Sequence, residues 1–279
     1  MHLQVSILVA VTLATMALSG GAKAAERFVL IAEEVNSQQT QSTRTEFDLV
    51  TERGEKYVVV RRYELLEAGG WKDVAVDDTC RANYNAPRGA IGRVRVVPPV
   101  EVNALAPICA PEPLFGALTD IVSFVDIAYD PTFRTAELKA AGESFALRGF
   151  SATWNRPPDL IEARIASERG QIRLESTKKN IKLVRWDPGP MKLTFERSLG
   201  GGRVARSQGI ENILLEVRLD RRTGRLLSGR SIEDRLDLTM EIPGASRPVD
   251  VKIRRRLVLQ PLRDRKPTRQ KASGRSLMN

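Results

Sequence analysis

Three carboxylates in one predicted helix have a spacing that could support acid–base chemistry. Asp126 and Asp130 are four residues apart, and Asp120 precedes them. If the helix extends to Asp130, the first two share a face, where a buried acid beside an ionised partner could cleave a glycosidic bond. An aspartate before Pro131 is equally ordinary turn chemistry at a helix exit. A carboxylate-dependent hydrolase is therefore our third functional hypothesis, and no catalytic residue is assigned.

Other chemical motifs lack the sequence context that they need. Ser176 to Lys179 matches the S-x-x-K of penicillin-recognising enzymes, but that chemistry requires a helix, and strand-like sequence flanks the motif. Gly200 to Arg203, GGGR, lacks the rest of a phosphate-binding loop and is expected to be a hairpin tip. Asp77 stands in no calcium-loop pattern. No metal site and no cofactor is predicted.

The amino-terminal segment predicts export. An apolar run from Val5 to Leu18 is followed by the small-x-small pattern Ala22-Lys23-Ala24. The run is shorter than the ~20 residues of a membrane-spanning helix, so we expect a signal peptide, residues 1–24, cleaved before Ala25. The expected location is the periplasm or the medium, and no transmembrane segment is expected after cleavage.

The expected state of the two cysteines, Cys80 and Cys109, depends on the compartment to which the protein is exported. Their spacing is not that of a C-x-x-C redox pair, and two sulfurs alone do not make a metal site. Because an oxidising compartment lets disulfides form and persist, we predict a Cys80–Cys109 disulfide.

Export also bears on the function class. The single histidine, His2, would leave with the signal peptide, which excludes Ser-His-Asp and Cys-His sites and makes an enzyme the less favoured class. The net charge of +10, or +9 without Lys23, favours anionic partners such as lipid headgroups. Nucleic acid is disfavoured because no aromatic residues interleave with the basic ones. Residues 263–279 are expected to be a basic disordered tail.

Apolar periodicity predicts a mainly β fold, an antiparallel meander forming a curved sheet or half-barrel with one covering amphipathic helix. Strands are expected at 27–35, 43–51 and 56–66, and then through 143–262, with chain reversals at 169–171 and 187–190 among others. The helix is expected from Glu112 to Tyr129, and 135–143 could form a second helical turn. Residues 25–135 hold the first strands, the cysteine loop and the helix, and 136–262 hold the meander; whether these are one domain is left open. In outline this plan is similar to exported carriers such as lipoprotein-localisation factors and periplasmic lipid binders, an analogy of fold only.

A ligand site is expected between the helix and the sheet. The predicted ligand-binding residues are Leu114, Leu118, Ile121, Val122 and Val125 of the helix, with Trp154 and Trp186 at strand ends. The tryptophans could equally fill the core. The leading hypothesis is a non-enzymatic binding or carrier protein for an amphiphilic or anionic ligand such as a lipid. The alternative is an envelope interaction or scaffold module that docks proteins through a sheet edge or the basic tail.

Overall fold

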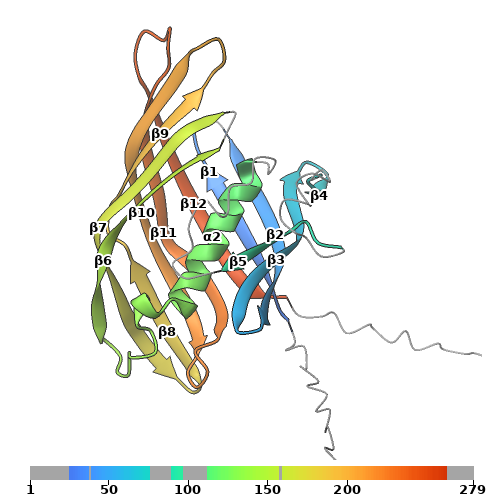
Figure 1. The fold of residues 1–279 in the computed structure, drawn as a ribbon, viewed down its shortest axis with the longest axis vertical. Helices are drawn as coiled ribbons and strands as arrows, with labels where there is room; N and C mark the ends of the chain where they lie inside the picture. The colour runs from blue at the N-terminus through green and yellow to red at the C-terminus, as the bar shows by residue number, and fades with distance from the viewer. Residues whose placement is uncertain (1–24, 38, 76–88, 97–111, 157–158, 263–279) are drawn as a thin grey trace, which may run out of the picture.

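A computed structural model of the chain describes residues 25–37, 39–75, 89–96, 112–156 and 159–262. In these residues twelve strands form one antiparallel sheet, with one α-helix lying across one face (Figure 1). The strands are β1 (Glu26–Val35), β2 (Thr40–Glu52), β3 (Glu55–Glu67), β4 (Gly70–Asp73), β5 (Gly92–Val96), β6 (Ser144–Arg156), β7 (Leu160–Lys178), β8 (Ile181–Asp187), β9 (Met191–Ser198), β10 (Val204–Asp220), β11 (Leu226–Glu241) and β12 (Val249–Pro261). The helix is α2 (Glu112–Tyr129), followed by the short 3-10 helix η2 (Pro131–Phe133). The predicted mainly β fold with one covering helix is confirmed.

The sheet joins the two ends of the described chain. Its order is β4-β3-β2-β1-β12-β11-β10-β8-β7-β6, with β5 beside β3 and β9 between β10 and β7. Because β1 pairs with β12 in the register Leu30↔Leu259, the first strands and the later meander form one sheet. The predicted signal peptide, both cysteines and the basic tail lie outside the described residues, so the signal peptide, the disulfide and the tail stay predictions.

Two of the expected chain reversals are wrong. Strand β7 runs straight through residues 169–171, and β8 and β9 both pair with β7 in one register, Ile172↔Trp186 and Ser167↔Met191. The glycines there serve close approach instead: a Cβ on Gly170 would lie 2.9 Å from the Asp187 carbonyl oxygen. The turn-forming residues therefore lie within β7 and between β8 and β9, and the chain reverses at neither place.

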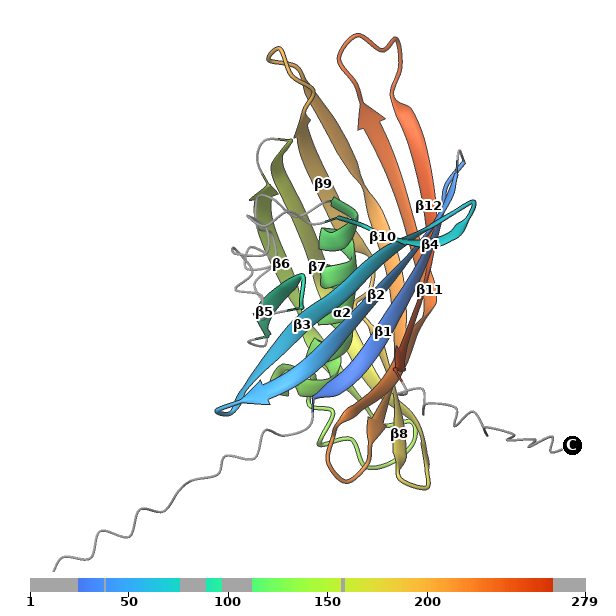
Figure 2. The same cartoon turned by 90° about the vertical axis from the view of Figure 1, so that its right-hand side faces the viewer.

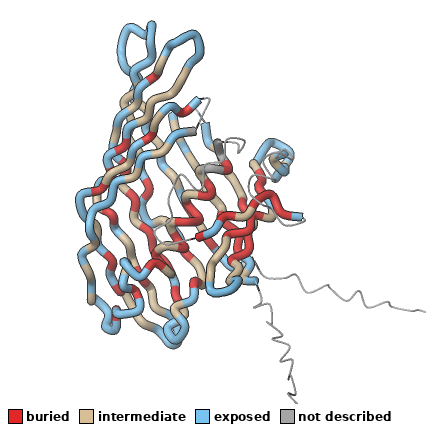
Figure 3. The backbone as a smooth tube through the Cα atoms, viewed as in Figure 1, coloured by how far each residue is buried: buried red, intermediate tan, exposed pale blue. Residues whose placement is uncertain are grey.

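The core lies between α2 and the lower part of the sheet (Figures 2 and 3). The apolar stripe of the helix meets β1, β2, β10 and β11, and Phe124 is fully buried against Gly229, where an added Cβ would lie 2.5 Å from the ring. Phe28 and Phe47 stack on neighbouring strands with ring centroids 5.6 Å apart. Residues 135–137 form turns and no α-helix, so the second helical turn is not formed there. No helix in the described part of the chain is long and apolar enough to cross a membrane.

Candidate functional site

The neighbouring strands β12, β11, β10, β9, β7 and β6 carry an apolar surface on the helix side, in a part of the sheet that extends past the end of the helix (Figures 1 and 2). Residues that are directly paired across an antiparallel sheet share a face, so the registers define three rows running from β12 to β6. The rows are Ile253-Leu236-Glu211-Met191-Ser167-Phe150, Val251-Leu238-Gly209-Leu193-Ile165-Ala152 and Val249-Met240-Ser207-Phe195-Ala163-Trp154. We call these eighteen residues the apolar face. Glu211 is its only charged member.

The opposite side of the same strands is polar. The two rows between those of the apolar face are Lys252-Asp237-Ile210-Lys192-Ala166-Ser151 and Asp250-Thr239-Gln208-Thr194-Arg164-Thr153. This alternation is typical of a sheet with one solvated side and one side that contacts something apolar.

The apolar face is only partly covered. Phe150 is 40% exposed and Val249 44%, whereas most of the other large side chains are half-buried. Trp154 belongs to the half-buried set, and its indole nitrogen has no hydrogen-bond partner among the described residues. A contiguous apolar surface of this kind, still partly open to solvent, is typical of a ligand or protein contact.

Where the apolar face meets the helix, four charged residues form a buried ion cluster. Arg255 contributes the only cation of this acidic cluster, and Asp120, Glu211 and Asp234 contribute three carboxylates. The Arg255 guanidinium reaches Asp234 through Nε at 3.1 Å and through Nη2 at 3.0 Å. Its Nη2 also lies 3.2 Å from Glu211 Oε1, and its Nη1 lies 3.2 Å from Asp120 Oδ1. Every guanidinium nitrogen is engaged, and two negative charges remain uncompensated when all three acids are ionised.

Four elements position the acidic cluster. Arg255 occupies an inward position of β12 between Ile253 and Leu257, and Glu211 stands in the first row of the apolar face on β10. Asp234 lies where the pairing of β11 with β12 is irregular, and Asp120 lies on the buried stripe of α2. The cluster therefore joins the helix to the sheet. The Arg255 side chain is 20% exposed, while that of Asp234 is fully buried.

Burial has the largest effect on the pKa values of the three carboxylates in the acidic cluster. Burial raises the pKa of Asp120 to about 6, and Arg255 limits the rise. Burial raises the pKa of Glu211 to about 7, again opposed by Arg255 and supported by the charges of Asp234 and Asp120. The Asp234 pKa is also raised by burial. Burial alone would lower the pKa of Arg255, but the three carboxylates hold it well above its usual range.

These raised pKa values predict that stability falls as the pH rises from 5 to 8. The folded protein holds protons on Asp120 and Glu211 more tightly than the unfolded chain does, so their contribution is present at low pH and is lost as the pH passes about 6 to 7. We expect the free energy of unfolding to be on the order of 2 kcal/mol higher at pH 5 than at pH 8. Urea unfolding at pH 5 and at pH 8 measures this difference in the free energy of unfolding. The double variant Asp120→Asn, Glu211→Gln should lose most of this difference; an equal difference in that variant would assign the effect to other groups.

The structure separates the predicted ligand-binding residues. The five helix residues Leu114, Leu118, Ile121, Val122 and Val125 are at most 7% exposed and pack in the core. A ligand reaches them only if the helix moves. Trp186 is half-buried and packs edge-on against Phe133, with centroids 5.8 Å apart. Trp154 lies on the apolar face. Whether any of them contacts a ligand stays a prediction.

The other sequence candidates have structural positions. Asp130 caps η2, because its carboxylate accepts a hydrogen bond from the Thr132 backbone N–H at 2.8 Å. Asp126 is half-buried on the helix. Ser176 lies within β7, Lys179 lies in the turn after it, and 200–203 form the tip between β9 and β10. From the sequence, Asp120 is only a possible acid–base partner, and Glu211, Asp234 and Arg255 are not recognised as its partners.

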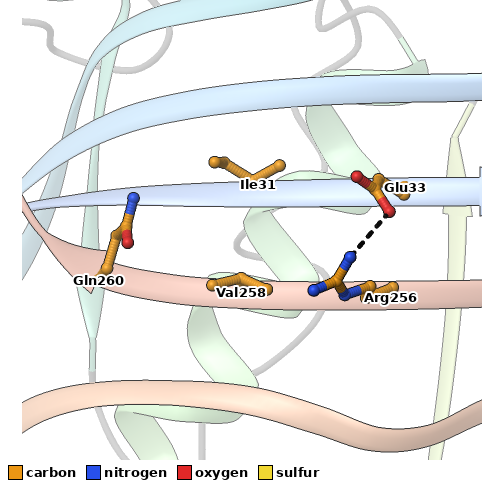
Figure 4. A pocket seen from close by; sticks show the side chains of 5 residues that line it. All are labelled: Ile31, Glu33, Arg256, Val258 and Gln260. Carbon is orange, nitrogen blue, oxygen red and sulfur yellow. Dashed lines mark ion pairs between the residues drawn. The ribbon is translucent and has the colours of Figure 1, made fainter.

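A cavity of about 220 Å³ lies on the side of the sheet away from the helix (Figure 4). Ile31 and Glu33 of β1 line it with Arg256, Val258 and Gln260 of β12. Its one ion pair, Glu33 to Arg256 at 3.5 Å, spans the two strands. The cavity is separate from the apolar face, because adjacent inward residues such as Leu257 point to the core.

Within the described ranges, no group of three or more His, Cys, Asp or Glu is placed to hold a metal ion. No protein-family model, curated protein or solved structure matches the chain.

Proposed function

We propose that this protein is an exported, non-enzymatic binding or carrier protein for an amphiphile, whose apolar chain lies on the apolar face. The observation that carries the proposal is the three-row apolar surface on the helix side of these strands, whose opposite side is polar. Fourteen of its eighteen members are aliphatic, aromatic or methionine side chains. Covering such a surface is favourable by roughly 25 cal/mol per Å² of apolar area removed from water.

The position of the site differs from the sequence expectation. A ligand between helix and sheet would have to replace the packed residues around Phe124, which is fully buried. Most of the apolar face, in contrast, lies outside the hydrophobic core cluster, to which only its members Met191 and Leu193 belong, and Phe150 and Val249 at its margins are exposed. From Glu211 to Ser207 along β10 it spans five residues, or four steps, about 14 Å at strand spacing. An extended alkyl chain of medium length fits that span.

The experiment is calorimetric titration with dodecyl maltoside, a neutral amphiphile, below its micelle concentration. Leu238 is half-buried in the middle row and is not part of the packed core. Leu238→Asp is expected to weaken binding by about tenfold or more, because the alkyl chain would desolvate a carboxylate.

The matched control is Thr194→Asp, on the polar side of the same part of the sheet beside Arg164, which should bind like the wild type. Circular dichroism checks that each variant is folded. Absence of binding to the wild type, or equal loss in both variants, would contradict the proposal.

The interaction-module alternative is supported by the edge of the sheet. Strand β6 is thirteen residues long and pairs only with β7 in the described structure. An unpaired strand edge offers backbone hydrogen-bonding groups to another chain. Light scattering across a concentration series tests whether two copies of the chain pair at this edge. If the protein is a monomer at all concentrations, the edge does not pair with a second copy, and the alternative then requires a different protein as the partner.

A further inference from the structure

The charge balance of the acidic cluster indicates the kind of head group that the site accepts, on the premise that the proposed amphiphile site exists. Arg255 is the only cation, and all its nitrogens are already directed at Asp120, Glu211 and Asp234. An anionic head group would meet a guanidinium whose three nitrogens already contact carboxylates, and it would meet an excess of carboxylates. A cationic head group would neutralise the excess.

Glu211 connects this cluster to the apolar face. It stands in the row nearest the helix, directly paired with Leu236 and Met191 of the same face. Its side chain is 11% exposed, and that of its partner Arg255 is 20% exposed. An alkyl chain lying along β10, across the three rows, therefore ends at its helix side beside the Glu211 carboxylate.

The hydroxyl of Tyr63 is a second polar group buried in the same interior. Tyr63 is 1% exposed, and its hydroxyl makes no hydrogen bond within the described part of the chain. Burial raises the pKa of Tyr63, the Thr43 side chain opposes the rise, and the charges of Asp120 and Glu34 add to it. The hydroxyl thus lies within the electrostatic reach of the cluster. Its oxygen is available to accept a hydrogen bond from an N–H donor.

We propose that the acidic cluster binds the protonated amine of a long-chain amine, while the alkyl chain lies along the apolar face. The ammonium group supplies three N–H donors and one positive charge to carboxylates that share a single guanidinium. The preferred ligand class is therefore a cationic amphiphile, in place of the anionic class that the net charge of the whole chain favours.

The test compares three ligands with the same dodecyl chain: dodecylammonium, dodecyl maltoside and dodecyl sulfate. Each is titrated calorimetrically into the full chain at pH 8, below its micelle concentration. We expect dodecylammonium to bind at least about tenfold more tightly than dodecyl sulfate. In Glu211→Gln, the preference for dodecylammonium over dodecyl maltoside should fall by about tenfold.

The matched control is Glu196→Gln on β9, whose carboxylate pairs with Arg206 at 3.0 Å and lies 40% exposed. It should keep the wild-type preference. Dodecylammonium affinity of the wild type should also rise from pH 5 to pH 8, as Glu211 ionises while facing Arg255, Asp234 and Asp120. This second measurement needs no variant.

Equal or tighter binding of dodecyl sulfate, or an unchanged preference in Glu211→Gln, would overturn the assignment of the head group and leave the amphiphile site standing. A wild type that binds none of the three ligands would overturn the proposed function and this assignment together.

Discussion

Replacing Arg255 by methionine is expected to lower the free energy of unfolding at pH 8 by about 3–5 kcal/mol. The change leaves the carboxylates of Asp120, Glu211 and Asp234 buried without their common cation. Removing one partner of a buried ion network is strongly destabilising because the remaining charges stay out of water. Urea denaturation followed by circular dichroism measures the loss.

Arg256 provides the matched control for that experiment. It is the next residue on β12, faces the other side of the sheet, and is 71% exposed with one ion pair to Glu33. Arg256→Met should change the free energy of unfolding by less than about 1 kcal/mol. Similar losses of unfolding free energy in both variants would mean that Arg255 in the acidic cluster stabilises the fold no more than an exposed arginine does.

Phe124→Ala is expected to be comparably destabilising, by about 3–5 kcal/mol. The ring is fully buried beneath the helix and contacts Gly229, so its removal leaves a cavity in the packed core. Thermal and urea unfolding measure the change. The neighbouring Ser123→Ala, whose hydroxyl only donates to the Thr119 carbonyl within the helix, should have little effect. A small loss of unfolding free energy in Phe124→Ala would contradict the conclusion that α2 packs in the hydrophobic core.

Strong local signals made much of the fold predictable. Alternation along β1 to β3 and the three- and four-residue spacing from Leu118 to Val125 placed these elements near their observed bounds. Reversals at 169–171 and 187–190 were wrong because Gly170 and Gly189 also permit the close approach of two backbones, and composition alone does not distinguish the two uses.

The acidic cluster was less visible in the sequence, although a signal was present. Arg255 interrupts the inward apolar positions of β12, between Ile253 and Leu257, and Glu211 does the same in β10. A charge at an apolar-phase position predicts a buried polar group. Three of its members come from β10, β11 and β12, which the sheet register places side by side, and Asp120 comes from α2, so only the packing of the helix on the sheet completes the cluster.

The most direct measurement of the central claim is native mass spectrometry of the protein purified from its own cells without detergent. We predict the mass of the polypeptide plus a bound species of defined mass, and loss of that species in Leu238→Asp but not in Thr194→Asp. Only the mass of the bare polypeptide in the wild type, under conditions that preserve non-covalent complexes, would contradict the claim that the apolar face holds an amphiphile.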